Sequence, residues 1–226
     1  MRVKGSYKPD VFEYELVDDG KTAVIRLYEN IEEYSEPEGE DGSPGTTGWE
    51  FDRYTIQRPH SERLQAQVEE ETAMWLAFAR NEETQQLRIE KLQMANDTAR
   101  QIIHSGVEVD GNHFSLTEVD QINLTTLAAQ MQAAMRGEES TIDLALGVPY
   151  HADGQLCRCW PPEEFAVIVQ AVTAHVFYHK TYCNHLRSYI KAINSPGELD
   201  AVYYGMELPG EYAESLAALL GTGEPE

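Results

Sequence analysis

The stretch GNHFSLTEVDQINL, residues 111–124, decides how the second half of this chain folds. Its first glycine follows Asp110, and an Asp-Gly pair between short apolar segments is a turn signal for a β-hairpin. Thr117 stands three residues before Asp120, which is a capping-box spacing with an acid in the first helical turn. The stretch therefore predicts a small hairpin that leads directly into a capped helix, from about residue 118 to residue 136.

The segments that follow extend this beginning into a mainly helical domain, which we place at residues 106–194. Residues 141–160 predict two strands around a turn formed by Asp153 and Gly154. Two prolines then open the strongest helical pattern of the chain, at residues 163–194, where apolar residues recur at helical spacing. The predicted core positions of this helix are Phe165, Ile168, Val169, Val172, Val176, Phe177, Cys183, Leu186, Ile190 and Ile193.

The beginning of the chain predicts a small β-sheet module, at residues 1–58. Residues 11–17 and 22–28 are rich in strand-forming side chains and flank a glycine-containing turn, so they predict a hairpin. Residues 49–56 alternate bulky and polar side chains and predict a third strand. The acidic, Gly- and Pro-rich residues 35–48 predict an exposed loop between these strands.

A long helical linker is predicted between the two parts, at residues 59–105. Residues 61–105 contain neither Gly nor Pro, Ser61 is a plausible N-cap, and Gly106 suits the position after the last turn. The polar residues 81–84 mark a place where this helix is expected to bend or break.

The linker helix carries a narrow apolar stripe, and such a helix needs a partner to cover it. We therefore expect a homo-oligomer, with a trimer preferred, in which this stripe forms the contact. The stripe comprises Leu64, Val68, Trp75 and Phe78.

Taken together, these segments predict an α+β fold. Its parts are an N-terminal small β-sheet module, a long spacer helix and a C-terminal mainly helical domain with small β-hairpins. An acidic tail follows at residues 195–226, with one short helix at 212–220.

The composition disfavours two classes of partner, nucleic acids and anionic membranes. Of the 226 residues 42% are hydrophobic, which is enough to bury a core, but 17 basic residues face 39 acidic ones for a net charge of −22. Direct contact with nucleic-acid phosphates or an anionic membrane is disfavoured, because both need clustered Lys and Arg. No apolar run approaches the roughly 20 residues that span a bilayer, and the N-terminus lacks the apolar core of a signal peptide. We therefore expect synthesis and folding in a cytoplasm.

A histidine and cysteine cluster on the last long helix is the strongest candidate for a metal site. His175, His179 and Cys183 follow one another at intervals of four residues, and imidazole with thiolate suits zinc. The spacing lacks a second Cys-x-x-Cys pair and a His-Glu-x-x-His motif, whereas His179 and Cys183 fall on the core stripe of the helix. We therefore predict no metal and no cofactor, and free thiols at all three cysteines.

Catalytic patterns are weaker still. The sequence has no Gly-x-Ser-x-Gly elbow and no Gly-rich phosphate loop. His113 with Asp120, and His151 with Asp153, could act as acid–base pairs, but at loop and hairpin positions such pairs more often fix turns. The residues themselves predict no catalytic group, and we expect a protein that is not an enzyme.

Three motifs carry a resemblance to a known family. They are residues 111–124, the run VPYHADG at 148–154, and the helical run YHKTYCNHL at 178–186; residues 47–56 also look like the leading part of such proteins. With these motifs the chain resembles a family of uncharacterised domains in proteins encoded among the tail-fibre and baseplate genes of tailed bacteriophages and prophages, notably of Gram-positive hosts. The family supplies no catalytic residues to carry over.

The resemblance implies a structural or assembly role at the tip of a phage tail. Such a protein would be made in the cytoplasm of a bacterial host, become part of the virion tail, and contact other tail or baseplate proteins. It could be a virion component or a small protein that helps fibres fold or attach.

Two other classes of function remain open from the sequence. An acidic phage protein could imitate nucleic acid and inhibit a host defence nuclease, in which case its carboxylates should line one face at phosphate-like spacing. A metal-dependent hydrolase would depend on the histidine and cysteine cluster.

Overall fold

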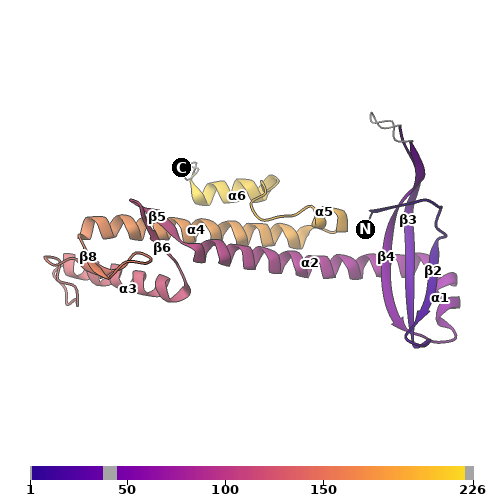
Figure 1. Ribbon diagram of the computed structural model, residues 1–226, viewed down its shortest axis with the longest axis horizontal. Helices are drawn as coiled ribbons and strands as arrows, with labels where there is room; N and C mark the ends of the chain where they lie inside the picture. The colour runs from indigo at the N-terminus through magenta and orange to yellow at the C-terminus, as the bar shows by residue number, and fades with distance from the viewer. Residues whose placement is uncertain (1, 38–44, 222–226) are drawn as a thin grey trace. The chain divides into compact units, whose positions relative to one another are not determined.

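The computed structural model describes residues 2–37 and 45–221 and confirms the predicted α+β class. It combines an antiparallel sheet, a long helix, and a helical C-terminal region with two small hairpins (Figure 1). The chain forms two compact units whose boundary lies inside the helix α2 (Thr72–Ser105), between Lys91 and Leu92. Ile193–Val202 belongs to the N-terminal unit, and the remaining C-terminal residues belong to the C-terminal unit. The boundaries predicted from the sequence lie at other positions, after residues 58, 105 and 194.

The N-terminal unit is built on a four-stranded antiparallel sheet in the order β1-β4-β3-β2. The predicted hairpin and third strand are β2 (Phe12–Val17), β3 (Thr22–Glu36) and β4 (Thr46–Pro59), while β1 (Arg2–Gly5) was not expected. Because β3 and β4 extend beyond the predicted strands, most of the expected loop at 35–48 that lies within the described residues is strand; residues 38–44 lie outside them.

The core of the N-terminal unit lies between one face of this sheet and two helices. The first helix, α1 (Leu64–Glu70), contributes Leu64 and Val68, and the start of α2 contributes Ala79. Val68 has no exposed surface, because strand side chains cover it. The strand residues of this cluster are Ala23, Ile25, Leu27, Tyr54 and Ile56.

The predicted linker helix is interrupted at a different place than expected. The break lies at Glu71, where the backbone leaves helical angles (φ −121°, ψ 36°), and residues 81–84 are helical. Thr84 is accommodated because its hydroxyl donates to the carbonyl of Arg80, 2.6 Å away, within the same helix. The first helix begins after Arg63 with no side-chain cap, so the prediction of Ser61 as the N-cap was wrong.

The C-terminal unit begins as the sequence predicted. Gly106 follows α2 with a positive φ of 85°, and the hairpin of β5 (Val107–Val109) and β6 (Asn112–Phe114) turns at Asp110 and Gly111. The helix α3 (Glu118–Met135) then starts at the predicted capping box, in which the Thr117 hydroxyl accepts from the amide of Asp120.

A second hairpin and the longest helix of this unit complete it. The hairpin pairs β7 (Val148–Tyr150) with β8 (Arg158–Trp160), and α4 (Pro162–Ala192) follows directly. A short helix, α6 (Gly210–Leu220), packs against α4, as the close ring contact of Tyr189 with Tyr212 shows. The helix predicted to end at residue 194 ends at Ala192, and the short helix α5 (Pro196–Asp200), which belongs to the N-terminal unit, was missed.

Aromatic side chains from both hairpins meet α4 in the core of this unit. Phe114 lies 6.2 Å from Tyr150 and 5.7 Å from Trp160, measured between ring centroids, and Tyr150 meets Phe165 of α4 edge-on. The indole of Trp160 donates to the carbonyl of Tyr150 over 3.0 Å, so its polar atom is satisfied inside the core. Phe177 is the exception among the predicted core positions of α4, because 51% of its surface is exposed.

The second part of α2 runs antiparallel to α4 inside the same unit. The Nε2 of His175 donates to the carbonyl of Ile102, and the thiol of Cys183 donates to that of Ala95. As the residue number rises from 175 to 183 on α4, the number of the contacted residue falls from 102 to 95 on α2, as in any antiparallel pair. Among the described residues, no helix has the length and apolar character needed to cross a membrane.

Candidate functional site

A polar cluster joins the two hairpins of the C-terminal unit, and it lies within the motifs that carry the resemblance. The carboxylate of Asp153 accepts a hydrogen bond from Nδ1 of His113 (2.7 Å), from the Ser115 amide (3.2 Å) and from the Ser115 hydroxyl. The amide of Asp153 donates in turn to the carbonyl of His113 over 2.8 Å. We call these three residues the hairpin junction.

The structure corrects the two acid–base pairs considered from the sequence. His113 pairs with Asp153, whereas Asp120 is engaged in the cap with Thr117, and the ring of His151 lies stacked on Tyr150. The expectation that such side chains fix turns holds for Asp153, which fastens one turn to the neighbouring hairpin. The separation of 40 residues between His113 and Asp153 leaves no local pattern that could have revealed the pair.

The hydrogen bonds of the hairpin junction hold backbone in position. A nucleophilic serine needs its hydroxyl on a basic nitrogen, with the carboxylate on the far side of the imidazole. Here the hydroxyl of Ser115 and the imidazole of His113 both bind the same carboxylate. The arrangement holds two backbone segments together, residues 113–115 and the turn at Asp153, and does not activate the hydroxyl.

The junction also makes folding of this unit sensitive to pH. The hydrogen bond to Asp153 raises the pKa of His113 above its ordinary 6.5, and the hydrogen bonds from Ser115 and His113 lower the pKa of Asp153 below 3.8. Because the pKa of His113 is raised, its contribution to stability is fully present below pH 6.5, the ordinary pKa of histidine. Because the pKa of Asp153 is lowered, its contribution is fully present above pH 3.8, the ordinary pKa of aspartate. The contribution is therefore greatest between these two values.

We expect Asp153→Asn to lower the melting midpoint by a few degrees, most strongly in that mildly acidic window. The difference from the wild type should shrink as pH rises through the raised pKa of His113 or falls through the lowered pKa of Asp153. Thermal melts between about pH 3 and about pH 8 measure it. Asp110→Asn is the matched control, because Asp110 stands at a positive φ that asparagine also tolerates. A pH-independent difference would contradict the assignment.

The predicted histidine and cysteine cluster is part of the packing of α4. Cys183 is buried, and burial raises the pKa of its thiol. Nδ1 of His179 lies 3.1 Å from the hydroxyl of Tyr204, while His175 is bound to α2, so the side chains are engaged with different partners. Burial, together with the neighbouring His175, lowers the pKa of His179. Within the described ranges, no three His, Cys, Asp or Glu side chains are grouped to hold a metal ion.

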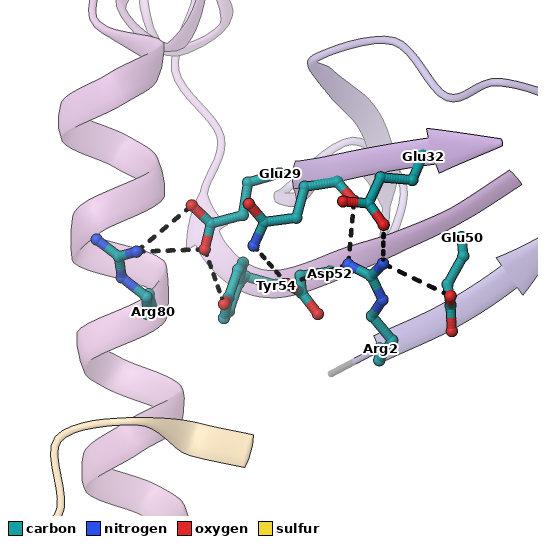
Figure 2. Close-up of polar contacts among 8 residues, drawn as sticks. Arg2, Glu29, Glu32, Glu50, Asp52, Tyr54 and Arg80 are labelled. Atoms are coloured by element: carbon teal, nitrogen blue, oxygen red, sulfur yellow. Dashed lines mark hydrogen bonds and ion pairs between the residues drawn. The ribbon is translucent and has the colours of Figure 1, made fainter. Parts of the chain in front are cut away.

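An acidic network on the sheet of the N-terminal unit gathers four carboxylates around two arginines (Figure 2). It forms at a bulge in the β3–β4 pairing, where Asn30 has a positive φ of 51°. Arg2 lies within 4 Å of three of these carboxylates, and Arg80 of α2 binds the fourth, which also accepts from the Tyr54 hydroxyl. The carboxylates are Glu29, Glu32, Glu50 and Asp52.

A groove of about 490 Å³ lies in the C-terminal unit between α2, α3 and α4. Its basic side chains are Arg100, Lys180 and Arg187, and we call it the cationic groove. Sequence analysis missed it, because its cations are up to 87 residues apart in a chain of strongly acidic composition. The remaining lining residues are Asn96, Ala99, Ile103, His104, Glu118, Gln121, Cys183 and Asn184.

Comparison with known proteins identifies a family. No curated protein and no solved structure matches the chain. The family model described as Domain of unknown function (DUF4376) matches residues 86–203, a span that contains the hairpin junction and all the residues that line the cationic groove. Because this match covers more than half of the 226 residues, the chain belongs to the DUF4376 family.

Proposed function

We propose that this protein is a non-enzymatic structural or assembly component of a bacteriophage tail tip, part of or attached to a baseplate or tail fibre. It is made in the cytoplasm of a bacterial host and resides in the virion tail. Support for the phage setting comes from the resemblance of residues 111–124, 148–154 and 178–186 to tail-associated domains.

The observation that carries the assembly role is a set of exposed apolar side chains on the helices of the C-terminal unit. On α3, Val119 and Ile122 are 64% and 65% exposed, and their spacing of three residues puts them side by side on one helix face. On α4, Val167 and Phe177 are about half exposed. Large apolar side chains left in water on rigid helices are typical of surfaces that bind another protein.

This surface replaces the contact that the sequence predicted. Leu64 and Val68 are buried in the core of the N-terminal unit, so the sheet of that unit already covers the stripe at these two positions. Trp75 is half-buried against the same core, and Phe78 keeps 46% of its surface exposed beneath the guanidinium of Arg58. The homo-oligomer, with a trimer preferred, is retained as a proposal and is now assigned to the exposed faces of α3 and α4.

The polar clusters agree with this role better than with the alternatives. The hairpin junction fastens backbone segments, and each carboxylate of the acidic network meets an arginine. A mimic of nucleic acid would use carboxylates that stand unpaired along one face. The proposal therefore concerns protein partners of the tail.

Mass spectrometry of purified phage particles from an induced lysogen tests the tail-tip placement. We expect peptides of this protein in intact particles, at a ratio to the major capsid protein that suits a few copies per tail. Particles lacking the protein, with the same peptides abundant in the lysate, would contradict its place in the virion.

A further inference from the structure

We propose that the cationic groove of the C-terminal unit is a docking site for an acidic, leucine-containing segment of a partner protein. The inference rests on the assembly role proposed above and names the chemistry of one partner. It starts from the distribution of charge. The C-terminal unit contains six Lys and Arg against sixteen Asp and Glu. Three of these six cations line the groove, and among the described residues only one carboxylate, that of Glu118, lines it with them.

The fold itself does not use these cations fully. Within the described ranges, the ammonium of Lys180 has no hydrogen-bond or ion-pair partner. The Nε of Arg187 is covered by protein and also has no hydrogen-bond partner there, which is a costly state for a buried donor. Arg100 contacts Asp97 at 3.8 Å, but both side chains are mostly exposed, so this pair contributes little to stability. Positive charge that has so few internal partners in a groove is suited to an external anion.

The rest of the lining decides which class of anion fits. Ala99, Ile103 and Cys183 are almost fully buried and form the inner part of the groove, while the exposed Arg100 and Lys180 stand at its rim. A segment that alternates leucine with glutamate can place apolar side chains inward and carboxylates on the cations, and Arg binds carboxylates with paired donors. A phosphate group would leave the apolar part of the lining unused. A nucleic acid would also be repelled by the net charge of −22.

The test uses the full chain and a labelled amphipathic peptide of leucine, alanine and glutamate, followed by fluorescence polarisation at low salt. We expect Arg100→Glu with Lys180→Glu to weaken binding by about tenfold, because attraction at the rim becomes repulsion. The matched control is Arg136→Glu with Lys191→Glu, which changes the net charge equally at exposed positions of the same unit outside the groove. It should alter affinity by no more than about twofold. The same peptide with glutamine in place of glutamate should bind as weakly as the wild-type peptide binds the groove variant.

A second measurement needs no variant. Carbodiimide joins peptide carboxylates to nearby lysines, and mapping on wild-type protein should find the cross-link at Lys180 and not at Lys191. Equal loss of binding in both charge-reversed variants, or cross-linking at both lysines, would overturn the proposal that the groove is the docking site. The binding would then be a non-specific attraction between opposite charges. Stabilisation by inorganic phosphate that depends on Arg100 and Lys180, without peptide binding, would also overturn it. If the peptide binds the groove but phage particles lack the protein, only the tail-tip placement is refuted. If the particles contain the protein but the peptide does not bind the groove, only the groove proposal is refuted.

Discussion

Replacing Phe165 with alanine is expected to destabilise the C-terminal unit by about 3–5 kcal/mol, because the change removes a fully buried ring and leaves a cavity. Phe165 has no exposed surface, and it lies where the first turn of α4 meets the aromatic residues of both hairpins. Loss of this ring removes the contact with Tyr150 and weakens the packing of the hairpins on the helix. Chemical denaturation followed by tryptophan fluorescence measures the loss, since Trp160 belongs to the same cluster.

The matched control is the same substitution at Phe177, on the same helix. Its ring is 51% exposed, so Phe177→Ala should change the free energy of unfolding of the monomer, measured at a concentration too low for assembly, by no more than about 0.5 kcal/mol. If both substitutions destabilise equally, the assignment of the buried face of α4 is wrong.

Replacing Gly147 with alanine is expected to destabilise the same unit by about 3–4 kcal/mol, from two separate causes. Gly147 has a φ of 90°, which L side chains rarely adopt. A Cβ there would also collide with the carbonyl oxygen of Trp160 across the β7–β8 hairpin, and that oxygen belongs to backbone that cannot move aside cheaply. Melting curves or denaturant titrations of the full chain report the effect.

Gly154 separates these two causes. It also has a positive φ, of 70°, but a Cβ added there meets nothing within 4 Å. Gly154→Ala should therefore cost only the strain of the backbone, about 1–2 kcal/mol. Equal losses at the two glycines would show that the close approach to Trp160 is not as described.

The parts of this fold that the sequence predicted are those with local signals. The turn at Asp110 and Gly111 and the cap formed by Thr117 and Asp120 each depend on residues a few positions apart, and both are present as expected. The strand β1 was missed because it is four residues long and pairs with β4, so that Arg2 lies opposite Asp52. No pattern within such a short segment announces a partner that far along the chain.

Helical spacing does not show which face of a helix is buried when apolar residues lie on all its sides. Phe177 fits the periodic pattern of α4 as well as Phe165 does, yet only Phe165 is buried. Periodicity shows that residues share a helix, and tertiary packing decides which of its faces is covered. The same limit applies to the linker stripe, where the sequence required a cover for Leu64 and Val68 and the sheet of the same unit provides it.

The candidate sites depend almost entirely on tertiary contacts. His113 and Asp153 were singled out individually but matched with the wrong partners, because each has a plausible partner closer in sequence. The cationic groove brings Arg100 of α2 together with Lys180 and Arg187 of α4 through the antiparallel packing of the two helices. The net charge of −22 is a sum over the whole chain. It therefore does not reveal the groove, where basic side chains outnumber acidic ones.

The most direct test of an assembly function that depends on the exposed faces of α3 and α4 is the mass of the full chain in solution. Light scattering at tens of micromolar should give a multiple of 25.5 kDa, with a trimer preferred. Ile122→Ser with Phe177→Ser should reduce this mass to that of one chain while circular dichroism shows the helical content retained, because both side chains are exposed in the single chain and the core is left intact. A wild-type protein that is strictly monomeric at this concentration, with a mass that the double substitution leaves unchanged, would contradict the account.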